Sequence, residues 1–214
     1  MIKKFISLLL AMIMIVSACI PAFAKTEENK AEKPIATLSL CSCIYVWPIA
    51  GHTWIYVHNT SKKPIQVGLY TVPAGQGVSI GSFCFTAYDG WGLYYNLEAC
   101  RENRSGYWVN HWSKTMNMTA TDLEKLNTAL RRYPNYWGPI ANCATFAFGM
   151  WNAVSGDSYI SLLIPAISQA EVIIGKGERG VLQMYEPTRD QVFKQRGMGD
   201  SAYLESVNNI TYYS

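Results

Sequence analysis

The order of apolar and polar residues divides the chain into a strand-rich first half and a helical second half. From Ile35 to about Glu98, short β-branched and aromatic segments alternate with clusters of turn residues, a pattern typical of antiparallel hairpins. Turn clusters at 59–64 and 73–77 separate the first segments. This half therefore predicts a meander of strands, at 53–57, 65–72, part of 78–85, and 93–97.

The first helix of the second half is predicted from a capping pattern and an apolar stripe. Thr121 and Glu124 have the spacing of a capping box, in which each side chain accepts from the other residue's backbone N–H. Leu123, Leu126 and Leu130 then recur at helical spacing. We expect this helix to bury its leucine face and to end before Pro134.

A second helix is predicted from about Asn142 to about Asn152, with Pro139 ahead of it and Gly156 behind it. Apolar residues surround the whole helix, which is typical of a helix buried on most sides. They are Ala144, Phe146, Ala147, Phe148, Met150, Trp151 and Ala153. A last helix is expected at 166–174, and one or two strands within 178–214. The fold class expected is α+β, one domain over 35–214.

The first 24 residues have the pattern of a secretory signal peptide. A start with Lys3 and Lys4, an apolar run over 5–16 and the end Ala22-Phe23-Ala24 match the three parts that signal peptidase requires. The run is too short for the roughly 20 residues of a spanning helix. We therefore expect cleavage after Ala24, a flexible polar leader over 25–34, and a secreted or cell-envelope protein.

A second interpretation of the same region remains open. Val16-Ser17-Ala18-Cys19 resembles a lipoprotein box. Cleavage there would leave a lipidated Cys19 and tether the protein to a membrane.

Charge and length narrow the function classes. Without Lys3 and Lys4, the chain has 16 basic and 15 acidic residues, and 190 residues follow Ala24. This balance gives no basic stripe of the kind that nucleic-acid binding requires, so we expect no nucleic-acid partner. The length suits one domain, and no later apolar run is long enough for a membrane span.

Five cysteines remain after the leader, and an odd number leaves at least one thiol without a disulfide partner. They are Cys41, Cys43, Cys84, Cys100 and Cys143. Cys84 and Cys100 flank one hairpin-sized segment and are the pairing that sequence proximity favours. The chain has no C-x-x-C pair and only three scattered histidines, so we expect neither a structural metal nor a cofactor.

Cys143 is the candidate nucleophile because it opens the buried helix. The partial positive charge at a helix N-terminus lowers a thiol pKa toward the reactive thiolate, although a single cysteine can equally be a small buried apolar residue. His52 begins the 53–57 strand, from which its side chain can reach a neighbouring helix end. The other histidines, His58 and His111, have the pattern of surface or partly packed residues.

These motifs are similar to those of the permuted papain-like superfamily, which includes NlpC-like cell-wall peptidases and lecithin:retinol acyltransferase relatives. The resemblance covers residues 50–153: Gly51-His52-x-Trp54 on a first strand, a meander, then Asn142-Cys143-x-x-Phe146-Ala147 opening a core helix. It implies a thiol hydrolase in which Cys143 attacks an amide or ester carbonyl and His52 is the base. Cell-wall peptides are the first substrate class that it implies.

The superfamily also has a polar residue that orients the histidine from a neighbouring strand, and the expected positions here are Gln66 and Asn96. No aspartate or further histidine stands at a comparable place, a departure that leaves the triad incomplete. The backbone N–H of Cys143 is the expected oxyanion donor, and Asn142 the expected helix cap. Two alternatives remain: a lipid-directed acyltransferase or lipase, and an inactive secreted binding module. The oligomeric state stays open.

Overall fold

A computed structural model describes residues 32–46, 50–83, 90–105, 111–135, 142–159 and 177–207. The chain divides into two units, residues 1–32 and residues 33–214, and every element below belongs to the second. The expected signal peptide, residues 25–31 of the leader, Cys84 and the expected helix at 166–174 lie outside the described residues.

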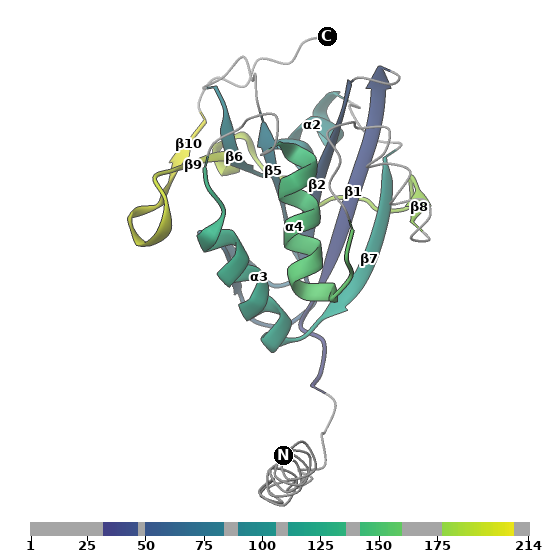
Figure 1. Cartoon of the computed structure of the whole chain (residues 1–214), viewed down its shortest axis with the longest axis vertical. Coiled ribbons are helices and arrows are strands. Elements are labelled where there is room, and N and C mark those ends of the chain that lie inside the picture. Colours follow the sequence, from purple (N-terminus) through teal and green to yellow (C-terminus); the bar gives the residue numbers. More distant parts are fainter. Residues whose placement is uncertain are drawn as a thin grey trace, which may run out of the picture. The chain divides into compact units, whose positions relative to one another are not determined.

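Ten described strands form two antiparallel sheets (Figure 1). The two-stranded sheet is a hairpin of β3 (Ile65–Val67) and β4 (Tyr70–Val72). The order of the eight-stranded sheet is β10 (Tyr203–Ser206), β9 (Phe193–Arg196), β6 (Gly92–Tyr95), β5 (Gly77–Phe83), β2 (Ala50–Asn59), β1 (Ala36–Val46), β7 (Trp112–Met118) and β8 (Glu178–Arg179). The expected α+β class and the antiparallel sheet are confirmed, and the sheet also includes strands from both ends of the described chain. The single strand expected over 65–72 was wrong, because the chain turns between β3 and β4 and forms the separate hairpin.

The two faces of the central strands carry different side chains because strand residues alternate. Ile55 and Val57 of β2 belong to the main core with α3 (Ala120–Arg132) and α4 (Cys143–Ser155), whereas Trp54 and Tyr56 pack with Ala99 of α2 (Leu97–Ser105). Figure 1 accordingly shows α3 and α4 in front of the sheet and α2 behind it. The sheet is therefore the middle layer between two helical layers.

Helix α4 matches its prediction closely at both ends. Asn142 is the N-cap, and Gly156 ends the helix with a φ of 73°, the left-handed conformation that glycine adopts at little cost. The helix is not buried on all sides, because Gly149 and Ala153 are exposed. Its buried residues are Ala144, Phe146, Ala147, Phe148, Met150, Trp151 and Val154.

Helix α3 buries Leu123, Leu126 and Leu130 as expected and ends before Pro134, but its predicted cap was wrong by two residues. Thr119 is the N-cap: its hydroxyl accepts from the Asp122 N–H at 3.2 Å, and the Asp122 carboxylate accepts from the Thr119 N–H at 3.2 Å. Strand β7 ends at Met118. The earlier of two overlapping Thr-x-x-acid patterns therefore forms the capping box.

Helix α2 was missing from the prediction. The expected strand at 93–97 ends at Tyr95, because Asn96 turns the chain with a φ of 66°. Asparagine is one of the few residues that tolerate this left-handed conformation. The helix begins directly afterwards at Leu97 and has Glu98 in its first turn.

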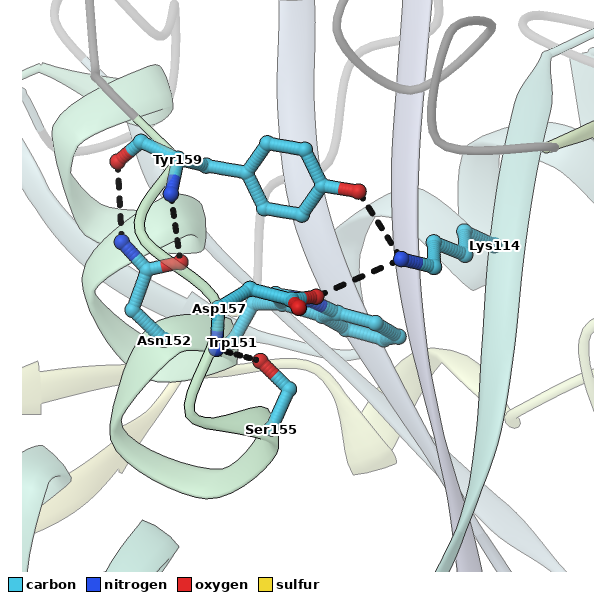
Figure 2. Close-up of polar contacts among 6 residues, drawn as sticks. All are labelled: Lys114, Trp151, Asn152, Ser155, Asp157 and Tyr159. Carbon is cyan, nitrogen blue, oxygen red and sulfur yellow. Dashed lines mark hydrogen bonds and ion pairs between the residues drawn. The ribbon is translucent and has the colours of Figure 1, made fainter.

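A polar cluster connects α4 and the residues that follow it to β7 (Figure 2). Lys114 of β7 donates to the Tyr159 hydroxyl at 2.8 Å and to the Asp157 carboxylate at 3.3 Å. Asp157 also accepts from the Trp151 indole N–H at 2.8 Å, and the Asn152 side chain bonds both backbone polar groups of Tyr159. These contacts hold the chain that follows α4 against the sheet. No described helix has the length and hydropathy needed to cross a bilayer.

Candidate functional site

His52 is a buried residue near the start of β2, where it pairs with Cys43 of β1. Its ring is nearly parallel to that of Trp54, with centroids 5.5 Å apart and planes at 13°, and its other neighbour Phe83 lies at 4.3 Å. The imidazole therefore packs against aromatic side chains of β2 and β5, which restrict its rotation.

Glu98 of α2 lies against the imidazole. Its Oε1 is 3.0 Å from His52 Nε2, and its Oε2 accepts a hydrogen bond from the Ser79 hydroxyl at 2.8 Å. The carboxylate is completely buried, which is costly unless both oxygens have partners. Gly81 of β5 leaves the room it needs, because a Cβ at that position would stand 1.8 Å from Oε1.

Cys143 completes the arrangement from the other helical layer. It is half-buried at the first position of α4, and its side chain is hydrogen-bonded to that of His52. The backbone amides of Thr53 and Ala144 also lower the pKa of the Cys143 thiol. Because Nε2 of His52 points at Glu98, Nδ1 is the nitrogen left for the sulfur. The structure thus joins Cys143, His52 and Glu98 in one chain of contacts.

The contacts shift both pKa values toward a charged pair. Burial alone would lower the pKa of His52, but its hydrogen bonds to Cys143 and Glu98 and their negative charges raise it to about 9. Burial would raise the pKa of Cys143, but the hydrogen bond and the charge of His52, with the two backbone amides, lower it overall. Both shifts therefore favour a thiolate beside an imidazolium, and the thiolate is the nucleophilic form of cysteine.

The start of α4 is shaped by Asn142, which has the expected capping role. Its Oδ1 accepts from the N–H of Ala144 at 2.9 Å and of Thr145 at 3.1 Å, and its own N–H donates to the Thr145 hydroxyl at 2.7 Å. The N–H of Cys143 occupies the first helical position, which has no acceptor within the helix. This amide is therefore placed to donate to a group near the sulfur.

The two residues expected to orient His52 do not approach its ring. Gln66 is exposed on the separate β3–β4 hairpin, where it donates to the carbonyl of Gly68 and accepts from Thr71. Asn96 donates to the carbonyl of Gln191. The position next to Nε2 belongs to Glu98, which corrects both expectations and supplies the carboxylate that the sequence reasoning had not found.

Sequence reasoning missed Glu98 because it assigned residues 93–97 to a strand and ended the sheet region there. The signal available was Asn96-Leu97-Glu98: a residue tolerant of a left-handed turn, followed by an acid at the second position of a helix, where the dipole favours it. A helix starting at Leu97 would have directed attention to the only carboxylate in its first turn.

The remaining histidines and cysteines are distributed around this site. His111 is fully buried, so the expectation of a surface or partly packed residue was wrong for it, whereas His58 is half-buried far along β2, opposite Gly77. Cys41 and Cys43 are buried thiols, and burial raises the pKa of Cys43 to about 12. The pairing expected for Cys100 stays a prediction, since Cys84 lies outside the described residues.

Neither protein-family models, nor curated proteins, nor solved structures gave a match to the chain.

Proposed function

We propose that the protein is a cysteine hydrolase in which Cys143 is the nucleophile, His52 the general acid and base, and Glu98 the residue that orients His52. One observation carries the proposal: the Cys143 side chain is hydrogen-bonded to an imidazole whose Nε2 is 3.0 Å from a buried carboxylate. A nucleophile, a base and an orienting group in hydrogen-bond sequence are the signature of covalent catalysis.

The reaction begins with attack of the Cys143 thiolate on an amide or ester carbonyl. A carbon–sulfur bond forms, and the carbonyl oxygen takes up the negative charge beside the Cys143 backbone N–H. The His52 imidazolium gives its proton to the leaving nitrogen or oxygen, and the carbon bond to the leaving group breaks. Water then attacks the thioester while His52 accepts its proton, which releases the acid and restores the thiolate.

Glu98 serves both halves of this cycle without touching the substrate. Because it holds Nε2, it keeps Nδ1 directed at the sulfur and stabilises the imidazolium that precedes the first proton transfer and follows the second. Ser79 fixes the second carboxylate oxygen, so Glu98 cannot rotate away from the ring without losing a buried hydrogen bond.

The substrate class proposed is amide bonds of cell-wall peptides, hydrolysed outside the cytoplasm. Support comes from the order of the elements: a histidine strand first, a meander, then a cysteine at the start of a core helix. This order is that of the permuted papain-like hydrolases that the motifs resemble, and we propose that the fold is of this type.

The test combines a chemical probe with a substrate screen. Iodoacetamide labelling of Cys143, followed by peptide mass spectrometry across pH, reports the thiolate directly. Cell-wall peptide fragments and lipid esters are then offered to the wild type, to Cys143→Ser and to His52→Gln. The matched control is His58→Gln, a histidine on the same strand outside the site.

We expect the wild type to label rapidly at neutral pH and to cleave peptide fragments. Cys143→Ser and His52→Gln should lose about 100-fold or more in turnover, and His58→Gln should keep the wild-type rate. Cleavage of the esters alone would move the substrate class to lipids. An ordinary thiol profile at Cys143, with no turnover of either class, would refute the enzyme proposal.

A further inference from the structure

A second histidine–carboxylate pair lies beside the site and takes no part in the reaction proposed above. His111 Nδ1 is 3.4 Å from Oε1 of Glu102. Glu102 lies one turn after Glu98 on α2, so both carboxylates leave the same face of the helix toward the sheet. His111 is completely buried, and Glu102 is 9% exposed.

Trp54 connects the two pairs. Its ring is nearly parallel to that of His52 at 5.5 Å, and it meets the ring of His111 edge to face, with centroids 5.0 Å apart and planes at 62°. Trp54 is itself completely buried. His52, Trp54 and His111 therefore form a continuous row of rings, with one glutamate of α2 beside each histidine.

Stability alone gives little reason to bury this second pair. Taking a carboxylate and an imidazole out of water costs free energy that their contact need not return, and well-packed apolar residues in such places are often as stable. Oε2 of Glu102 makes no hydrogen bond to a described residue, which adds to the cost. The charge of Glu102 also raises the pKa of two buried groups nearby, the Cys41 thiol of β1 and the Tyr56 phenol of β2.

We propose that His111 and Glu102 are positioning residues for the reacting pair and act through Trp54. The inference rests on the proposed function of Cys143 and His52. Glu102 fixes the ring plane of His111, the edge contact fixes the indole of Trp54, and the parallel stack keeps the His52 ring from rotating about its Cβ–Cγ bond. Rotation would turn one nitrogen away from the sulfur and the other from Glu98.

The experiment compares two shapes beside Trp54 without leaving a buried charge. Glu102→Gln is the background, into which His111→Phe or His111→Leu is introduced. Phenylalanine keeps a flat ring against Trp54, whereas leucine does not. The readout is the iodoacetamide labelling rate of Cys143 against pH, with urea unfolding as the measure of folding and His58→Leu as the matched histidine control.

We expect the labelling profile of Cys143 in the leucine double variant to shift about one pH unit higher than in the phenylalanine one, because its apparent thiol pKa rises. The control should match the wild type. Equal profiles in two folded double variants would overturn the inference.

If the leucine double variant does not fold, the Glu102→Gln single variant tests the positioning role. NMR titration of the His52 ring should then give a pKa below the wild-type value, and an unchanged titration overturns the inference. The two proposals fail in different ways. An ordinary thiol profile in the wild type refutes the hydrolase and with it the positioning role, whereas a reactive wild-type thiol with equal Phe and Leu variants refutes only the positioning role.

Discussion

Replacing Gly81 by alanine tests whether Glu98 sets the state of the reacting pair. Gly81 is a buried residue of β5 in ordinary extended backbone, so alanine meets no conformational strain there. Its new Cβ would stand 1.8 Å from Oε1 of Glu98 and 2.9 Å from Nε2 of His52. The substitution therefore acts on the contact between the carboxylate and the imidazole.

The size of the effect follows from these distances. Carbon and oxygen atoms approach to about 3.3–3.6 Å, so the carboxylate must retreat by roughly 1.5 Å. Even half of that shift stretches the 3.0 Å contact with His52 past the range of a hydrogen bond. Losing a charge-assisted hydrogen bond costs about 1.5–3 kcal/mol, and the crowding about 1–3 kcal/mol, which most domains tolerate without unfolding.

The assay is the pH profile of Cys143 labelling, measured together with turnover. Without Glu98 the imidazolium is less stable, so the thiol pKa should rise and the labelling profile should shift about one pH unit higher. Turnover should fall about 100-fold, because the ring is no longer oriented. Gly149→Ala is the matched control: its Cβ meets nothing within 4 Å, and alanine should stabilise α4 by about 0.5–1 kcal/mol.

The reasoning is refuted by a folded Gly81→Ala protein with the labelling profile and turnover of the wild type. Such a result would mean that the charged pair does not depend on Glu98. A loss of reactivity in Gly149→Ala as well would show that labelling reports general changes in packing rather than this contact.

Three further predictions follow from other contacts. Asn142→Ala removes the cap of α4 and should cost about 1 kcal/mol in urea unfolding; no loss would show that the cap is dispensable. The imidazolium of His52 should stabilise the fold fully below about pH 6.5 and lose that effect as pH rises through about 9. The Cys143 thiolate should lose its stabilising effect as pH falls through its lowered pKa. Free energies of unfolding measured across this pH range check both dependences. Asp157→Asn should cost less than about 1 kcal/mol, because the Lys114 and Asp157 side chains are 27% and 40% exposed and water screens them, and the loss should shrink as salt is added.

The local periodicity of apolar residues was sufficient to predict the helices and strands that bury one face. The alternation around Ile55 and Val57 predicted β2, and the leucine spacing predicted α3, because burial imposes a period that the sequence must obey. Local signals also placed Cys143 at the start of α4, since Asn142 and Gly156 are residues typical of the two ends of a helix. The elements that position the nucleophile and the base were thus within reach of the sequence.

The pairing of strands that are distant in the sequence could not be predicted from the sequence. Tyr95 of β6 pairs with Phe193 of β9, and no local pattern records which strand lies next to which across so long an interval. Glu98 was missed for a related reason: one backbone conformation at Asn96 changes a strand into a turn and a helix. His111 was misjudged because its burial depends on Trp54 and Glu102, which lie elsewhere in the chain.

The distance along the chain between the two reacting residues has a consequence for folding. His52 and Cys143 are 91 residues apart, and they meet only once β2 has joined the sheet and α4 has docked on it. Contacts of such long range form late, because closing a long loop costs entropy before the contact repays it. Until then Cys143 is an ordinary thiol, largely protonated at neutral pH. The rise in the alkylation rate of Cys143 during refolding therefore marks the completion of the native topology. The reacting cysteine is thus an intrinsic probe for refolding experiments.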